Sequence, residues 1–456
     1  MKKNLFSTKL FLIISFALLS FSCKDDDEVT GTQRYKEPPV LLSSIPATGG
    51  TVSFTDNTIR LIFDREVTVV NLGMVSINNA IISGSSVSGD TLTFTLDGLD
   101  EKTPYTLTIT KGAIKGVPGL LNQEDITLSF NTGEAPALTK TLAMPNASAQ
   151  ANNVFNFLLE NYRNKIISGS MAKVNWNTDE ADRVYRWTGK YPAINTFDFV
   201  HLYASPTNWI DYSNTTVAEN WWNNKGLISI MWHWNVLIEG TSNFGFYYTG
   251  KNNGEGETSF DITKAVQDGT DENKIIKADL DKVATHLLAL QAKGIPVIWR
   301  PLHEAAGGWF WWGAKDANSY KALWILMFET FKAKGINNLI WVWTTETNDN
   351  SWYPGDAYVD IIGRDIYNKK DAAAIYKEYL SIRKTYPNKM VTLSECGNVA
   401  NISQQWSANA KWSWYMPWYD YNATDESEHS HATKVFWTDA FASDKVITRD
   451  QMPSLK

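Results

Sequence analysis

The pattern of hydrophobic and polar positions divides the chain into two folded regions. Between residues 38 and 133, apolar and polar residues alternate with period two in short segments separated by turn residues. Such alternation is typical of strands that have one buried face and one exposed face. The spacing of the segments predicts a small antiparallel β-sandwich with strands at 51–54, 58–63, 75–77, 91–96, 105–110 and 126–130.

Residues 134–149 are rich in Ala, Pro, Thr and Asn and are interpreted as a linker, after which the pattern changes. Continuous apolar, β-branched runs alternate with helical patterns such as 278–293 and 319–334. Over 150–456 this rhythm predicts an α/β fold, a (β/α)8 TIM barrel. The eight expected strands are 166–169, 193–197, 227–234, 297–304, 339–343, 359–363, 390–395 and 414–418.

The N-terminus has the layout of a secretory signal, with a basic start, an apolar core at 10–19 and small residues before Cys23. It resembles a bacterial lipoprotein signal, which implies that residues 1–23 are a signal peptide and that Cys23 is lipidated. The acidic stretch 24–37 would then be a tether on the outer face of the outer membrane. An ordinary signal peptide cleaved elsewhere is the alternative.

Charge and aromatic content narrow the class of ligand. The net charge of -7 argues against nucleic acid, which requires a basic surface. The chain contains 20 Trp, 19 Tyr and 20 Phe, and some of the Trp residues cluster beside Gly- or Asn-rich sequence at 221–222 and 309–312. Flat rings with a polar edge suit a ligand that is partly apolar and partly hydroxylated, such as a sugar.

Polar side chains follow several of the predicted barrel strands. A barrel places the carboxyl ends of its strands on one face, so these side chains are expected to converge. Hydrolysis of a glycosidic bond with retention requires two carboxyls about 5–5.5 Å apart, one as acid and one as nucleophile. The converging residues are His233, His303, Glu304, Asp365, Tyr367 and Glu395.

Four phrases in this order resemble glycoside hydrolase family 26, whose members are mostly β-mannanases. They are Trp299-Arg-Pro-Leu-His-Glu304, Gly308-Trp-Phe-Trp-Trp312, Tyr353-Pro-Gly-Asp356 with the following 359–367, and Leu393-Ser-Glu395. The resemblance covers about residues 150–453. It implies a retaining endo-β-1,4-mannanase that needs no cofactor and acts on β-mannan or a related polysaccharide. One departure is Ala305-Ala306, where many relatives have an asparagine.

The same resemblance implies a role for each matching residue. Glu304 is the expected proton donor and later base, and Glu395 the expected nucleophile. Tyr367 would hydrogen-bond Glu395. The remaining residues would contact substrate: His233 and His303 around the attacked sugar, Trp309 and Trp312 on the sugar-binding floor, and Trp418 at the end of the last strand.

Phrases in the N-terminal sandwich resemble bacterial Ig-like domains. They include Pro46-Ala-Thr-Gly-Gly50 and Phe130-Asn-Thr-Gly133. Such a domain is expected to be a spacer without catalysis, and carbohydrate binding by its surface is the less favoured interpretation.

Several alternatives stay open. His233 could be a core histidine. No spacing typical of a catalytic metal site occurs, although the loops 252–257 and 349–356 could hold calcium. Cys396 could be a thiol nucleophile but lacks a recognisable His and Asn partner pattern. The substrate could be a β-1,3-1,4-glucan or xylan, or the protein could be a surface glycan-binding protein without catalysis.

Overall fold

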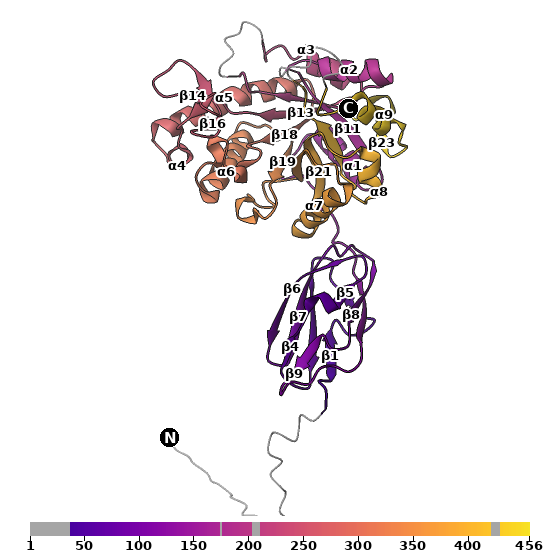
Figure 1. The fold of residues 1–456 in the computed structure, drawn as a ribbon. Coiled ribbons are helices and arrows are strands. Elements are labelled where there is room, and N and C mark those ends of the chain that lie inside the picture. The colour runs from indigo at the N-terminus through magenta and orange to yellow at the C-terminus, as the bar shows by residue number, and fades with distance from the viewer. Residues whose placement is uncertain (1–36, 174–175, 203–209, 421–428) are drawn as a thin grey trace, which may run out of the picture.

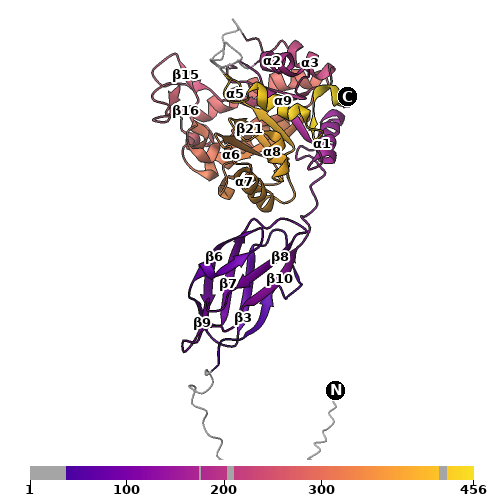
Figure 2. The ribbon, with the colours of Figure 1, turned by 45° about the vertical axis from the view of Figure 1, so that its right-hand side comes forward.

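The computed structural model describes residues 37–173, 176–202, 210–420 and 429–456 of the chain (Figure 1). Cys23, the predicted signal and the predicted tether up to residue 36 lie outside the described residues. Within the described residues, no helix is both long and apolar enough to cross a membrane. Figures 1 and 2 show an elongated β domain followed by a larger α/β domain.

The N-terminal domain is a sandwich of two four-stranded sheets, in the orders β1-β3-β7-β6 and β2-β10-β8-β5. Its core consists of the inward residues of the alternating strands, such as Ile59, Leu61 and Phe63 of β3, which are 0% exposed. A short ribbon pairs β4 with β9. The strands are β1 Leu41–Ile45, β2 Thr51–Val52, β3 Thr58–Phe63, β4 Val67–Val69, β5 Val75–Ile77, β6 Ile81–Ser88, β7 Thr91–Asp97, β8 Pro104–Ile109, β9 Ile114–Gly116 and β10 Ile126–Thr132.

The C-terminal domain is a closed parallel barrel of eight strands, as the sequence predicts. Sheet order follows the chain, and the ring closes where β11 pairs with both β12 and β22. A short extra strand, β23 Val446–Ile447, pairs with the outer part of β11. The barrel strands are β11 Ile166–Met171, β12 Ile194–Asp198, β13 Leu227–Trp232, β18 Val297–Pro301, β19 Leu339–Thr345, β20 Ile361–Tyr367, β21 Met390–Gly397 and β22 Trp414–Pro417.

Helices surround this barrel (Figure 1), and most begin at a side chain that caps the free backbone N–H groups. Asp316 accepts from the N–H groups of Asn318 and Ser319 and starts α6, whereas Thr270 starts α5. The helices are α1 Ala149–Asn161, α2 Asp179–Thr188, α3 Thr216–Asn223, α4 Ile262–Ala265, α5 Asp271–Ala292, α6 Ala317–Ala333, α7 Ala372–Thr385, α8 Ile402–Ser407 and α9 Lys434–Ala442.

The bounds of two barrel strands that carry expected site residues, β18 and β20, differ from the prediction. β18 ends at Pro301, so the chain turns before the expected acid, and Leu302 and Glu304 adopt left-handed φ values of 49° and 53°. β20 starts and ends later than predicted and therefore includes Asp365 and Tyr367. Its register against β21 shifts between Arg364 and Asp365. These bends set the directions of the side chains at the barrel mouth.

The long segment between β13 and α5 folds over the same face. It contains four short strands, and Tyr247 forms an isolated antiparallel bridge with Phe310. The insertion therefore lies beside the aromatic stretch that follows Glu304. Its strands are β14 Val236–Leu237, β15 Phe244–Gly245, β16 Tyr247–Tyr248 and β17 Glu257–Thr258.

Candidate active site

Three carboxylates gather at the mouth of the barrel. One oxygen each from Glu304, Asp365 and Glu395 lie within 4.8 Å of one another. Asp365 and Glu395 are 5% and 7% exposed, whereas Glu304 is partly exposed. The structure thus brings the two predicted catalytic glutamates together at the short separation used for retention.

Arg300 neutralises two of these carboxylates. Its guanidinium, from β18, donates to Asp365 Oδ2 at 2.8 Å and also to Glu395 Oε2. Burial lowers the pKa of Arg300, but the carboxylates of Asp365 and Glu395 outweigh burial and hold the pKa above its usual value. Ser394 completes the cluster by donating to Asp365 Oδ1 at 2.7 Å. A permanent cation therefore supports the ionised form of Glu395.

Tyr367 contacts the expected nucleophile directly, with its hydroxyl donating to Glu395 Oε1 at 2.6 Å. Burial and the Asp365 carboxylate raise the pKa of Glu395 above its ordinary value, and Arg300 and Tyr367 oppose this rise. Both carboxylate oxygens of Glu395 are thus fixed in direction by a donor.

Within the described part of the chain, Glu304 has no cation hydrogen-bonded to its carboxyl group, unlike Glu395. Burial, followed by the charges of Asp365, Glu395 and Glu346, raises its pKa to about 10. Trp309 Nε1 donates to Glu304 Oε2 at 3.0 Å, which leaves Oε1 to carry the proton. Because Glu395 receives two donors, including a cation, and Glu304 receives a neutral one, the proton of the pair is held on Glu304.

The two predicted histidines lie beside each other, with ring centroids 4.5 Å apart. His233 Nδ1 contacts Asp198 Oδ2 at 2.5 Å, and its backbone N–H donates to Asp198 Oδ1 at 3.0 Å, so Asp198 sets the ring orientation. His303 is 2% exposed, and burial together with His233 holds its pKa well below the ordinary value. His303 is therefore neutral and lies beneath the site surface.

Some aromatic residues of the site are partly exposed to solvent, and others pack beneath them. Trp309 is partly exposed, and Trp418, also partly exposed, lies 5.8 Å from His233 between ring centroids. Trp312 is 0% exposed, so its expected place on the sugar-binding floor is wrong. It instead donates from Nε1 to the His303 carbonyl at 2.9 Å and stacks on Phe310 at 4.5 Å.

Three residues of the site were not singled out from the sequence. Arg300 could have been found as a charge inside a buried strand, because an unpaired charge there would be costly. Asp198, at the end of β12, could have been found by its strand-end position. Tyr247 gave no sequence signal: it lies in the insertion, and its pKa is raised by burial and by Glu304 and Glu395, which it faces.

The alternative chemistries find less support in the described residues. Cys396 is fully buried, and burial raises its pKa well above the ordinary value, which opposes a thiolate. The three site carboxylates are close enough for a cation, but Arg300 already pairs with two of them. Neither 252–257 nor 349–356 gathers three His, Cys, Asp or Glu side chains within the described part of the chain.

Solved and curated relatives resemble this chain throughout the barrel. The GH26 domain of an endo-beta-mannanase/endo-beta-glucanase from Prevotella bryantii is 41% identical with a TM-score of 0.63, covering 69% of this chain and 99% of that domain. A beta-mannanase from a symbiotic protist of the termite Reticulitermes speratus is 34% identical with a TM-score of 0.63, covering 70% of this chain and 100% of that structure. Mannan endo-1,4-beta-mannosidase B of Piromyces sp is 35% identical over 327 residues, which are 70% of this chain and 54% of that protein.

The chain spans about half the length of the first curated relatives it matches. Residues 35–132 match a bacterial Ig-like domain. Residues 143–450 match glycosyl hydrolase family 26, over well more than half of the chain. The eight-stranded barrel with its paired glutamates agrees with this match. The chain therefore belongs to glycosyl hydrolase family 26.

Proposed function

We propose that this protein is a retaining endo-β-1,4-mannanase that cleaves mannan-type polysaccharides by double displacement. The observation that carries the proposal is the pair Glu304 and Glu395, which have one oxygen each within 4.8 Å of the other and differ in their hydrogen-bond donors. Relatives that cover the barrel include mannan endo-1,4-beta-mannosidase B of Piromyces sp and a beta-mannanase from a termite symbiont. The proposed cycle requires no cofactor.

In the first step, the ionised Glu395 attacks the anomeric carbon and the bond from that carbon to the glycosidic oxygen breaks. Glu304 gives its proton to the departing oxygen, so the leaving chain ends in a hydroxyl. Arg300 and Tyr367 hold the attacking carboxylate in place through the hydrogen bonds to its two oxygens. The result is a glycosyl ester of Glu395.

Formation of the ester removes the negative charge of Glu395, which is one of the charges that raise the pKa of Glu304. Glu304 then accepts a proton from water as the water oxygen attacks the anomeric carbon. The ester bond breaks, Glu395 returns to its carboxylate form and Glu304 regains its proton. Two inversions at one carbon give net retention.

The substrate class is tested by measuring reducing ends released from mannan, lichenan and xylan. The proposal expects mannan to be the preferred polymer, with oligosaccharides of several lengths appearing early, as mid-chain cleavage gives. Preference for lichenan or xylan would assign the barrel to a glucanase or xylanase. Binding without cleavage of any of the three would make it a glycan-binding protein.

We also propose that the protein is an outer-membrane lipoprotein exposed at the cell surface. The basis is the order of basic, apolar and small residues before Cys23 and the acidic stretch that follows. A Cys23→Ala variant should leave the membrane fraction, and unchanged membrane association of that variant would overturn the anchor.

A further inference from the structure

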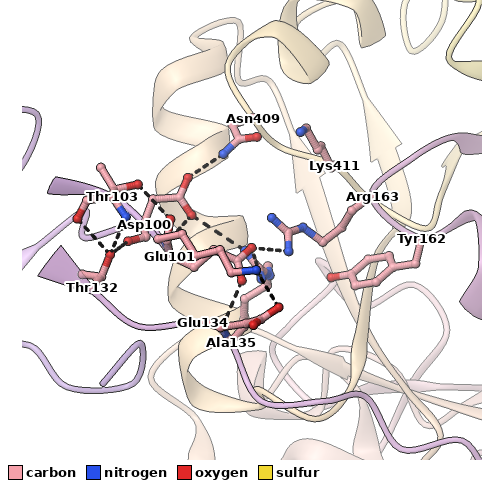
Figure 3. Close-up of polar contacts among 12 residues, drawn as sticks. Asp100, Glu101, Thr103, Thr132, Glu134, Ala135, Tyr162, Arg163, Asn409 and Lys411 are labelled. Carbon is pink, nitrogen blue, oxygen red and sulfur yellow. Dashed lines mark hydrogen bonds and ion pairs between the residues drawn. The ribbon is translucent and has the colours of Figure 1, made fainter. Parts of the chain in front are cut away.

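The Ig-like domain is docked on the barrel by two adjacent acidic residues in the turn before β8 (Figure 3). Asp100 Oδ2 accepts from the Tyr376 hydroxyl at 2.7 Å and from Asn409 Nδ2 at 2.5 Å. Glu101 pairs with Arg163 and accepts from Arg383 Nη2 at 3.2 Å. The Glu101 side chain is only 12% exposed, so this contact is largely shielded from water.

Additional contacts fix the joint on both sides of this acidic pair. The Arg383 guanidinium lies 5.0 Å from the ring centroid of Phe54, a residue that is 1% exposed. The linker also contacts the barrel, where the Thr139 N–H donates to the Asn388 carbonyl at 2.9 Å. The two domains therefore hold one relative position through charge, packing and linker contacts.

Beside this joint lies a groove of about 1100 Å³ that both domains line, and Tyr376, which donates to Asp100, is one of its lining residues. The Ig-like side contributes Asn57 and Asn79, and the barrel side contributes α7 together with Asn348 and Asn350. The last two belong to the loop after β19, at the same end of the barrel as the active site. That loop also carries Glu346, whose charge acts on Glu304.

The groove presents accessible hydrogen-bonding groups. Asn79, Asn348 and Asn350 are exposed and Asn57 is partly exposed, so their side-chain amides are accessible to a ligand. Among the described residues, the buried Nζ of Lys384 has no hydrogen-bond partner. An amide both donates and accepts, as a sugar hydroxyl does. Asp97, Lys377 and Lys384 are the charged residues among those that line the groove, and the other lining residues are uncharged. This mainly uncharged lining suits a ligand rich in hydroxyls.

We propose that this groove is an accessory site for the polysaccharide itself, binding a stretch of chain that continues beyond the catalytic cleft across the rim formed by Asn348 and Asn350. The inference rests on the proposed function for the identity of the sugar. The Ig-like domain is then part of the substrate-binding surface as well as a spacer.

The test compares a long and a short substrate in the full-length protein. Asn79 and Asn348 both have a φ of 56°, so Asn79→Gly/Asn348→Gly removes both amides without straining the backbone. The matched control is Asn146→Gly, at another asparagine with a φ of 56° that lies outside the groove. Loss of two hydrogen bonds is expected to lower kcat/KM on polymeric mannan by about tenfold, with no change on a short manno-oligosaccharide.

A second variant tests the same site by obstruction. Ser381 lies on the exposed face of α7 that lines the groove, so Ser381→Trp adds bulk there and should again slow only the polymer. Equal kcat/KM of wild type and both variants on the polymer would overturn the groove while leaving the mannanase assignment intact. A wild-type protein inactive on polymer and oligosaccharide would overturn the mannanase assignment, and the groove proposal with it.

Discussion

The hydroxyl of Tyr367 donates a 2.6 Å hydrogen bond to Oε1 of Glu395, and this bond favours the ionised form of the carboxylate. Removing the hydroxyl in Tyr367→Phe should therefore raise the pKa of Glu395. The nucleophile would then become protonated at a higher pH. The acidic limb of the kcat/KM profile should therefore shift to higher pH by about one unit, which corresponds to the loss of one hydrogen bond to a charged group.

The check is a pH profile of kcat/KM on mannan for Tyr367→Phe and the wild type. Tyr415→Phe is a suitable control, because Tyr415 is also buried in the barrel but its hydroxyl has no hydrogen-bond partner among the described residues. An unshifted acidic limb in Tyr367→Phe would show that Tyr367 does not influence the ionisation of Glu395.

The alkaline limb should report on Glu304, whose protonated form is required in the first step. Its pKa of about 10 is raised in part by the charge of Glu346. Glu346→Gln removes that charge, so the pKa of Glu304 should fall and the alkaline limb should move to lower pH. Glu378→Gln is the matched control, because Glu378 pairs with the same Arg364 but is not among the charges that raise the pKa of Glu304. Equal shifts in the two variants would contradict this role of Glu346.

Separate roles for the two glutamates predict different behaviour toward leaving groups. Glu304→Ala should lose about a thousandfold or more in kcat on mannan, in line with the usual contribution of acid–base catalysis. It should nevertheless retain attack on an aryl β-mannobioside whose leaving group needs no proton, and added azide should accelerate release of the trapped sugar.

Glu395→Ala should be inactive on both the polymer and the aryl substrate, because no nucleophile remains to form the ester. Circular dichroism of both variants serves as the folding control. Azide attack on the glycosyl ester in Glu304→Ala should give a glycosyl azide of retained configuration, whereas azide that replaces the nucleophile in a variant without it gives the inverted azide. An inverted azide from Glu304→Ala and a retained azide from Glu395→Ala would reverse the two assignments.

The barrel was predictable because its strands are buried on both faces and therefore read as continuous apolar runs, from Leu227 to Trp232 as much as from Met390 to Leu393. β6 of the sandwich was missed, since Ile81–Ser88 contains four serines and a glycine and buries little. Periodicity also cannot distinguish a ring that contacts ligand from one that packs beneath it. For this reason Trp309 and Trp312 were given the same role, although only Trp309 is partly exposed.

Replacing Glu101 at the contact between the two domains should lower the stability of the protein. Glu101→Ala removes the carboxylate that pairs with Arg163 and with Arg383, whose side chain is 6% exposed and then keeps only its 3.9 Å contact with Asp100. The docked arrangement should lose about 2 kcal/mol, less than when a buried charge loses its only partner. Calorimetry should show the transition of the Ig-like domain at a lower temperature than in the wild type.

Lys102→Ala provides the comparison for Glu101→Ala, because it breaks the neighbouring ion pair with Glu134, whose side chains are 62% and 70% exposed. Exposed pairs contribute little, so this variant should stay within about 0.5 kcal/mol of the wild type. Equal effects of the two variants would mean that the shielded contact of Glu101 does not hold the domains together.

Glu304 has a left-handed backbone with a φ of 53°, which lowers the stability of the fold at a residue that the proposed reaction requires. A side chain in that conformation is strained by about 1 kcal/mol, and the buried carboxyl adds a desolvation cost. A glycine at this position would relieve both and give a more stable but inactive protein. Selection for stability alone would therefore remove this carboxyl, so under the proposed function its presence reflects a requirement of turnover.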